Sequence, residues 1–365
     1  MLEQGKISIR QATLLMVLTI LATAILFLPS IATEQAGQDA WISAIIATVN
    51  GIIISLLVVT LMRRFPNQTI VEYSEDILGK FLGKIVGLGY FWFFLHTNAI
   101  IIREFGDFMI AAFMPKTPLV VFNSMIIILA VLVVRSGLEP LGRLNEWIFI
   151  LYISILLTIT VFLLPVMEVE NLLPILEGGI LPPLKGALTP TSWFGEIIIL
   201  SMIFPFLTQP HRGYRVAIGA HLIVGAFLLI GVAQAVSIFG PVLVSAVKFP
   251  IMQTVRLISL GGFFDRVEVL VMVVWIAGVF VKVSVFHYAT VLSAAQLFGL
   301  SDYRPLVIPL GILAVILSIH LFQNVSDLIE FLSVTFSVYA LSTFEVGVPA
   351  LLLLVALARG KGGSL

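Results

Sequence analysis

Two ionisable residues lie inside long apolar stretches of this sequence. Lys282 follows the run VMVVWIAGVFV, and Glu345 lies within the last apolar segment at a similar predicted depth. A charge at the centre of a membrane-spanning helix costs about 2.5–3.5 kcal/mol on insertion scales unless it is paired or faces a polar cavity. The two residues could couple ions or protons to a binding event, or they could form a buried structural ion pair with each other.

Proline interrupts two of the apolar stretches at similar positions. Leu28-Pro29 interrupts the first, and Phe204-Pro205 interrupts the sixth. Proline removes an amide donor and displaces the carbonyl four residues earlier, here those of Ile25 and Ser201. Matched interruptions in two halves of a transporter point to a ligand site at the middle of the membrane, although proline kinks without such a role are also common in membrane helices.

The residues around these interruptions are predicted to line a ligand pocket, in which the small side chains of Ala24 and Ser201 leave room for the ligand. Tyr90, Phe94 and Asn98 are spaced four apart and share one helix face that could close the pocket, although such a stripe is more often packing. The predicted ligand-binding residues are Thr23, Ala24, Ile25, Leu28, Tyr90, Phe94, Asn98, Ser201, Met202 and Phe204, with Lys282 and Glu345 as coupling residues.

The remaining charged residues within apolar stretches have structural interpretations. Arg103 and Asp107 are four apart and are predicted to form a local pair. Glu196 begins the sixth stretch, where a carboxylate favours a helix N-terminus. The five histidines have no metal-ligand spacing and the chain has no cysteine, so we predict no metal, no cofactor and no enzymatic activity.

The elements that hold these residues must be membrane helices. Of 365 residues, 60% are hydrophobic and 11% charged, with a mean hydropathy of +1.14, whereas soluble domains carry about 25% charged residues. The net charge is zero, which argues against nucleic acid as a partner. We therefore predict an all-α integral membrane protein with a single membrane domain over residues 1–365.

A spanning helix needs about 20 apolar residues, and ten segments meet this requirement. They are 9–33, 40–62, 81–113, 118–135, 145–165, 192–208, 213–240, 266–298, 305–322 and 330–357. Because five spans per half force the halves into opposite orientations, we predict a 5+5 inverted repeat, 9–165 and 192–357, with the first helix of each repeat broken.

The connections define an orientation and three interfacial segments. With a cytoplasmic N-terminus, inner connections hold thirteen Lys and Arg residues against five in outer ones, so both termini are predicted to be cytoplasmic. Segments 166–191 and 241–265 are expected to lie along the outer surface, the latter with an amphipathic helix. Segment 66–80 is expected to lie along the inner surface.

Several short motifs resemble the spore-permease family, the B subunits of endospore germinant receptors. They are AGQDAW at 36–41 after an Ile-Leu-x-Leu-Pro helix, Phe65-Pro66 with Leu78-Gly79-Lys80, Asn171-Leu172-Leu173-Pro174, and Phe249-Pro250 followed by Arg256. That family is similar to the amino acid–polyamine–organocation transporters. Its members often carry a glycine near the first break, where this chain has Ala22-Thr23-Ala24.

The resemblance implies a subunit that senses a small germinant, often an amino acid, in the spore inner membrane. Its partners would be an A-type membrane subunit and a C-type lipoprotein. The alternative is a proton-coupled amino acid permease that uses Lys282 or Glu345. Fold analogy alone does not separate sensing from transport, so both functions stay open at this point.

Overall fold

The computed structural model describes residues 3–258 and 267–363, and helices form the regular structure of these parts of the chain. The long helices are α1 (Ile9–Ala36), α2 (Ala40–Arg64), α4 (Lys80–Ala112), α5 (Leu119–Ser136), α6 (Leu138–Leu163), α10 (Gly213–Ala246), α12 (Val267–Leu297) and α13 (Arg304–His320). The shorter helices are α3 (Ile70–Leu78), α7 (Leu181–Gly186), α8 (Leu188–Gly195), α9 (Leu200–Ile203), α11 (Pro250–Arg256), α14 (Val325–Glu330), α15 (Ser337–Tyr339) and α16 (Gly347–Ala358). The 3₁₀ turns are η1 (Gly37–Asp39), η2 (Leu164–Val166), η3 (Val169–Leu172), η4 (Glu196–Ile199), η5 (Phe204–Phe206) and η6 (Pro210–Arg212), and the π-helical turns are η7 (Phe331–Phe336) and η8 (Ala340–Glu345).

Eight helical stretches of the described chain are long and apolar enough to cross a membrane. The first of them, Ile9–Arg64, contains both α1 and α2, and Arg304–His320 is a shorter apolar helix. Each of the ten predicted segments coincides with helical structure, although residue 266, the predicted start of the eighth, lies outside the described residues. The prediction of an all-α, multi-pass membrane protein is confirmed.

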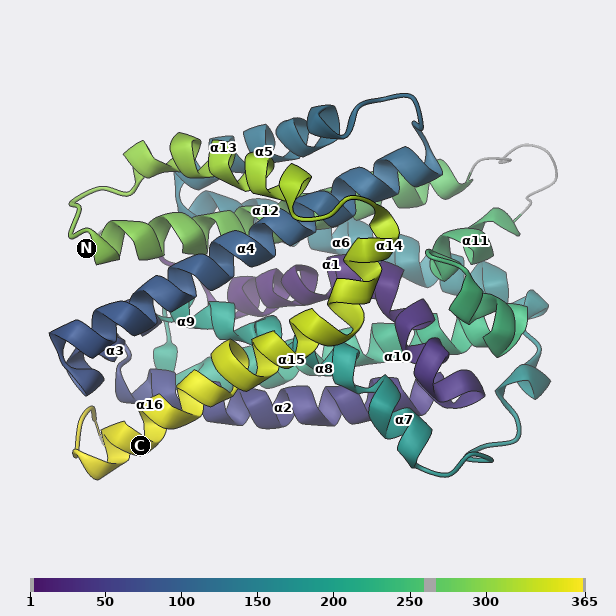
Figure 1. The fold of residues 1–365 in the computed structure, drawn as a ribbon, viewed down its shortest axis with the longest axis horizontal. Helices are drawn as coiled ribbons and strands as arrows, with labels where there is room; N and C mark the ends of the chain where they lie inside the picture. The colour runs from purple at the N-terminus through teal and green to yellow at the C-terminus, as the bar shows by residue number, and fades with distance from the viewer. Residues whose placement is uncertain (1–2, 259–266, 364–365) are drawn as a thin grey trace.

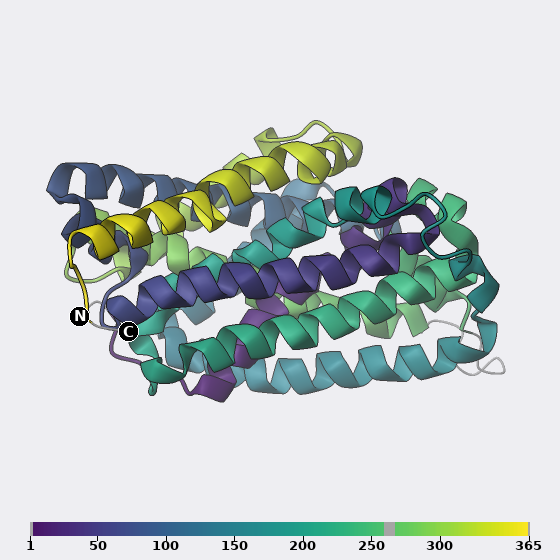
Figure 2. The ribbon, with the colours of Figure 1, turned by 90° about the horizontal axis from the view of Figure 1, so that it is seen from below.

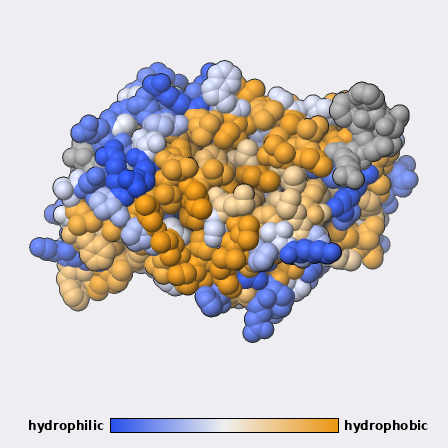
Figure 3. Space-filling view, turned by 90° about the horizontal axis from the view of Figure 1, so that it is seen from above, coloured by the Kyte–Doolittle hydropathy of each residue, from blue (hydrophilic) through white to orange (hydrophobic). Residues whose placement is uncertain are grey.

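The long helices lie side by side along the long axis of the molecule, and both chain termini lie at the same end (Figures 1 and 2). α1 is central, because it packs against α10, α12 and α6 and nearly all of its side chains are buried. By contrast, α5 and α6 present many exposed leucine and isoleucine side chains. A broad hydrophobic area covers the face shown in Figure 3, with hydrophilic residues mostly around its margin, as a surface in contact with lipid requires.

The predicted break in the first helix is wrong, because α1 is continuous through Leu28 and Pro29. α1 contains no glycine, the residue that would most readily leave the helical conformation. Side-chain hydroxyls instead bind carbonyls around the proline, and Thr33 Oγ1 donates to the Pro29 carbonyl over 2.6 Å. One missing amide donor therefore does not unwind this buried helix.

The predicted interruption of the sixth segment is present and is longer than expected. α8 passes into the 3₁₀ turn η4, and the single-turn helix α9 passes into η5 at Pro205. Backbone carbonyls in this region bind groups from other elements. A ring nitrogen of His221 on α10 lies 3.0 Å from the Phe194 carbonyl, and Lys6 Nζ donates to the Pro205 carbonyl over 2.8 Å.

Residues 3–7, which we call the N-terminal strap, pair with the chain that follows this interruption. The Ile7 amide donates to the Phe206 carbonyl over 2.9 Å, and the Thr208 amide donates to the Ile7 carbonyl over 3.0 Å. The result is a short parallel bridge between Ile7 and Leu207. The strap therefore closes the bundle at the end where the termini lie.

Glu3 anchors the other end of the strap. Its buried carboxylate accepts hydrogen bonds of 3.1 Å from the Leu138 amide, at the start of α6, and from the Tyr303 hydroxyl, before α13. Burial and the adjacent Glu3 carboxylate raise the pKa of Tyr303, so its hydroxyl remains a donor. We call residues 188–206 the interrupted segment. The strap is thus joined to two helices as well as to the chain that follows the interrupted segment.

At the opposite end of the bundle, the polar residues after α1 hold the long connection between α6 and α7. The buried Asp39 carboxylate accepts the Leu176 amide at 3.0 and 3.1 Å. Gln38 Nε2 donates to the Pro174 carbonyl over 3.1 Å. The AGQDAW motif therefore ends α1 and fixes this connection.

Each of the three predicted interfacial segments contains a short helix, which in segment 166–191 is α7. α3 occupies Ile70–Leu78 and begins with a capping box formed by Thr69 and Glu72. α11 occupies Pro250–Arg256 within the predicted outer segment, of which residues 259–265 lie outside the described residues.

Candidate functional site

Lys282, on α12, is at the centre of a charged cluster buried inside the bundle. Its Nζ atom lies 2.8 Å from both carboxylate oxygens of Glu196, and neither residue is more than 2% exposed. Lys282 also donates a hydrogen bond of 2.8 Å to the hydroxyl of Thr23 on α1. One ammonium group therefore joins α12, the interrupted segment and the central helix.

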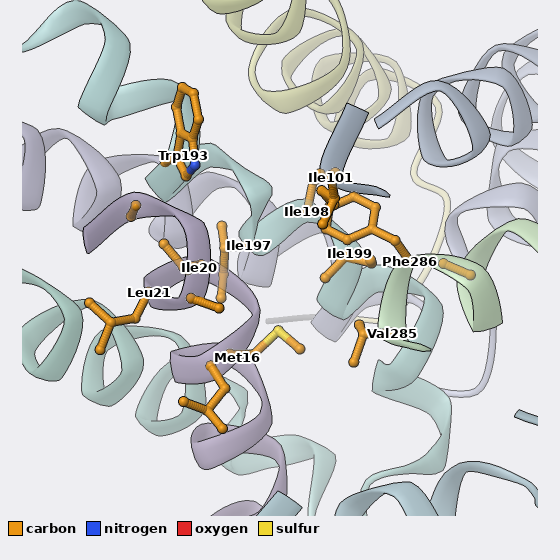
Figure 4. Packing of buried hydrophobic residues seen from close by; sticks show 14 of the residues in the cluster. Met16, Ile20, Leu21, Ile101, Trp193, Ile197, Ile198, Ile199, Val285 and Phe286 are labelled. Atoms are coloured by element: carbon orange, nitrogen blue, oxygen red, sulfur yellow. The ribbon is translucent and has the colours of Figure 1, made fainter. Parts of the chain in front are cut away.

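The local structure around the interruption places these groups. Glu196 is the first residue of η4. Trp193, three residues earlier, donates from Nε1 to the Thr23 hydroxyl over 3.0 Å. The same elements contribute to the buried hydrophobic core, among others through Ile20 from α1, Ile197 from η4 and Val285 from α12 (Figure 4). Exclusion of water strengthens the electrostatic interactions of the buried pair and also makes an unpaired charge there costly.

The hypothesis of a Lys282–Glu345 ion pair is wrong, since the ion-pair partner of Lys282 is Glu196. The sequence interpretation of Glu196 as a helix N-terminal charge misses this contact. The 3₁₀ turn that begins at Glu196 breaks the regular helix and brings the carboxylate to Lys282. The apolar pattern of the segment gives no sign of that turn.

Glu345 lies close to this pair without binding it. It ends the π-helical turn η8 and is completely buried, and its charge interacts with those of Glu196 and Lys282. Its carboxylate rests against Gly195, where any Cβ atom would collide with it. Neither carboxylate oxygen has a hydrogen-bond partner among the described residues. π-Helical turns frequently occur at functional sites, and a buried carboxylate without a partner is unfavourable unless it binds a proton or a ligand.

A third carboxylate, Glu104 on α4, completes the cluster. Its charge interacts with those of Lys282 and Glu196, and one of its oxygens has no hydrogen-bond partner among the described residues. The sequence interpretation gave Glu104 no role of its own. It considered only the local ion pair of the neighbouring Arg103 and Asp107. That neighbouring pair is confirmed, with Arg103 Nε 2.8 Å from the Asp107 carboxylate.

The predicted aromatic face of α4 points toward the last span. The hydroxyl of Tyr90 donates to the Phe344 carbonyl over 2.8 Å, and its ring lies 5.8 Å from that of Phe94. Asn98 is completely buried, and neither atom of its amide group has a hydrogen-bond partner in the described structure. Buried amides are normally paired, so Asn98 has the hydrogen-bonding capacity that a ligand would use.

The four predicted residues of α1 do not all reach the charged cluster. Thr23 binds Lys282, and Ala24 and Leu28 are completely buried. Ile25 lies on a different side of α1, where its Cδ1 atom occupies the space beside Gly231 of α10. Ile25 also lines a small apolar cavity of about 30 Å³ together with Trp275.

Ser201, Met202 and Phe204 are all completely buried within the interrupted segment. The Ser201 hydroxyl has no hydrogen-bond partner within the described part of the chain, and Tyr73 of α3 lies beside it. The ring of Phe204 packs against Gly213 at the start of α10. Ser201 is therefore a polar group available to a ligand, and Phe204 has a packing role.

Taken together, the cluster contains one ammonium group and three carboxylates in an apolar interior. In the described chain, no group of three or more His, Cys, Asp or Glu side chains has the arrangement of a metal site. Such an excess of carboxylates suits the binding of protons or of the ammonium group of a small ligand. These features define a transporter-like membrane protein with a charged site in its core.

Comparisons with solved structures support this class. MhsT in complex with L-phenylalanine matches 98% of this chain and 90% of its own chain, with a TM-score of 0.69 and 15% identity. Mhp1, a nucleobase-cation-symport-1 family transporter, matches 99% of this chain and 80% of its own, with a TM-score of 0.72 and 13% identity. At these identities the likeness concerns the fold, which is that of membrane transporters.

The chain belongs to the spore germination protein family, whose model matches residues 6–326. Spore germination protein KB of Bacillus subtilis is 30% identical over 99% of this chain and 97% of its own length. Spore germination protein YndE of the same organism is 28% identical over 98% of each chain. The resemblance to the spore-permease family is thus confirmed, and both of these relatives are spore germination proteins.

Proposed function

We propose that this protein is the germinant-sensing membrane subunit of a spore germination receptor. It binds a small nutrient, with an amino acid favoured, at the middle of the membrane between α1 and the interrupted segment 188–206. Binding changes the arrangement of these two elements, and the change is passed to partner subunits. The partners are an A-type membrane subunit and a C-type lipoprotein.

The observation that carries this proposal is the buried contact of Lys282 with Glu196 and Thr23 in a chain of the germination family. The contact joins the central helix to the interrupted segment. A ligand that competes for Lys282 or Glu196 would therefore change how these elements pack. Unpartnered groups nearby, on Asn98 and Ser201, supply further hydrogen bonds.

We further propose ten spans in two inverted five-helix repeats, 9–165 and 192–357. This count treats α1 and α2 as separate spans and includes α13, whose 17 residues reach about 26 Å at 1.5 Å per residue. The protein would lie in the spore inner membrane with both termini on the core side. The excess of Lys and Arg in the predicted inner connections supports this orientation.

The test is ligand-induced thermal stabilisation of the purified full chain, screened over amino acids, nucleosides and sugars. We expect amino acids to stabilise the protein and an Ala24→Phe variant to lose this response, because the added ring fills the predicted pocket. Ala12→Phe is the matched control, since Ala12 is equally buried on α1 but lies far from the cluster. A normal response in a folded Ala24→Phe variant would exclude this pocket.

The second candidate is a proton-coupled amino acid permease, which the unpartnered Glu345 carboxylate favours. A permease would accumulate radiolabelled amino acid in proteoliposomes under an imposed pH gradient, and Glu345→Gln would abolish the accumulation. A sensor would bind the same amino acid without accumulating it. The stabilisation screen and the uptake assay together separate the two functions.

A further inference from the structure

An open cavity of about 280 Å³, lined by both polar and apolar side chains, lies at the end of α1 opposite the N-terminal strap. The last turns of α1, the end of α10 and the region of α14 and η7 form its walls. Four serine residues contribute to the lining, namely Ser30, Ser245, Ser326 and Ser333. The hydroxyls of Ser30, Ser245 and Ser333 each donate to the carbonyl three residues earlier and offer a solute only acceptor capacity. The cavity therefore offers many hydrogen-bonding groups and has the dimensions of a small solute.

Charges of both signs line this cavity. Glu34 and Glu330 contribute carboxylates, and Lys248 contributes an ammonium group that donates to the Ser326 hydroxyl over 3.2 Å. None of the three takes part in an ion pair with another residue of the described chain. These charges are therefore available to a solute that carries complementary charges.

The cavity lies on the same face of α1 as the Lys282 contact. Ser30 lies seven residues after Thr23, and Glu34 lies eleven residues after it. Both spacings return to the same side of an α-helix. Seven residues correspond to about 10 Å along the helix axis. A solute in the cavity would thus lie close to the buried cluster, because α1 contacts both sites.

A cluster of aromatic rings packs against this part of α1. Phe27 lies between Thr23 and Ser30 on this face of α1, and its ring centre is 5.3 Å from that of Phe249. Phe249 in turn contacts Phe108 at 5.1 Å, and Phe108 contacts Trp275 at 4.3 Å. These rings form a continuous buried aromatic cluster beside α1.

We propose that this cavity is a second binding site, which captures a small zwitterion, an α-amino acid, before it reaches the core. The ligand's ammonium group would bind Glu34 and Glu330, and its carboxylate would bind Lys248 and the Ser326 hydroxyl. The ammonium group of Lys248, in the same lining as the two carboxylates, disfavours a divalent cation. The inference shares only the ligand class with the function proposed above.

Because the sequence contains no cysteine, a single introduced thiol reports on this cavity. In the full chain in lipid nanodiscs, Ser245→Cys places the thiol in the cavity, and Ser136→Cys places an exposed thiol at the opposite end as a control. The rate of maleimide labelling is measured with each of the twenty amino acids. Ethylamine, propionate and Ca²⁺ serve as probes of a single charge and of a metal.

We expect at least one amino acid to slow the labelling of Ser245→Cys and not of Ser136→Cys. Ethylamine and propionate should have little effect at the same concentration. Adding Lys248→Gln or Glu330→Gln should weaken the protection about tenfold or more, the usual size of one charge-assisted hydrogen bond. Protection should persist in a Lys282→Met/Glu196→Gln background, in which neither member of the buried pair is left unpaired, because this site does not use the core cluster.

Three results would overturn the inference. They are no protection by any amino acid, equal protection by ethylamine or propionate, and protection by Ca²⁺ alone. Loss of protection in a folded Lys282→Met/Glu196→Gln background is a fourth result that would overturn it, since the protection would then arise from the core site. That last result would leave the proposed germinant-sensing function intact, so the two proposals can fail separately.

Discussion

The ammonium group of Lys282 and the carboxylate of Glu196 lie 2.8 Å apart although 86 residues separate them in the sequence. Neither group is appreciably exposed, so each charge is stabilised chiefly by the other, and that of Lys282 also by the Thr23 hydroxyl. This contact connects a long regular helix to the least regular segment of the bundle. Its strength therefore controls how firmly the interrupted segment is held.

The first prediction concerns the energetics of this pair. Lys282→Met and Glu196→Gln should each lower the free energy of unfolding by about 3–5 kcal/mol, because each leaves a buried charge unpaired. The double variant should recover most of the loss. Thermal unfolding of the four proteins in one detergent measures this coupling, and simple addition of the two losses would show that the residues are not partners.

The second prediction separates Glu345 from that pair. Because the Glu345 carboxylate has no hydrogen-bond partner in the described structure, Glu345→Gln should leave stability unchanged or raise it. The same change should nevertheless abolish the germinant response of spores that carry only this variant, if Glu345 binds a proton or the ligand. A full response in a stable Glu345→Gln variant would assign the residue no functional role.

The third prediction uses the contact between Gly195 and Glu345. A methyl group at position 195 would occupy the space of the Glu345 carboxylate, so Gly195→Ala should displace this group and reduce ligand-induced stabilisation. Gly219→Ala is the matched control, because its new methyl group would meet only Thr13 at an ordinary distance of 3.5 Å. Equal ligand responses in the two variants would contradict the prediction.

The fourth prediction tests the Thr23 hydroxyl. Thr23→Val keeps the side-chain shape but removes an acceptor used by both Lys282 and Trp193. The loss should cost about 1–3 kcal/mol, the usual penalty for a buried donor without its partner. In the control Thr19→Val, the hydroxyl that is lost binds only a carbonyl of its own helix, and its effect on thermal stability should be smaller.

Helix positions could be predicted from the sequence because membrane spans have a strong and uniform signal. A run of about 20 apolar residues has few structural alternatives in a bilayer, and helical structure coincides with every predicted segment. The prediction that proline interrupts its helix is confirmed at Pro205 and wrong at Pro29. Proline removes one donor wherever it occurs, but neighbouring residues and packing decide whether the helix continues.

The site could be predicted only in part, for a related physical reason. Lys282 and Glu345 are recognisable because charges are rare in apolar segments, whereas their partners depend on how each helix is rotated. The 3₁₀ turn at Glu196 and the π-helical turn before Glu345 change that rotation locally. Neither turn has a clear sequence signal, so the Glu196 contact and the role of Glu104 appear only in three dimensions.

The N-terminal strap has a consequence for measuring conformational change. It is joined to the interrupted segment by two amide hydrogen bonds, from Ile7 and from Thr208, each worth about 0.5–1.5 kcal/mol net. Such a bridge can open far more often than the bundle unfolds. Deuterium uptake at these two amides would therefore report, on a timescale of seconds to minutes, how often this end of the protein opens and whether a nutrient changes that frequency.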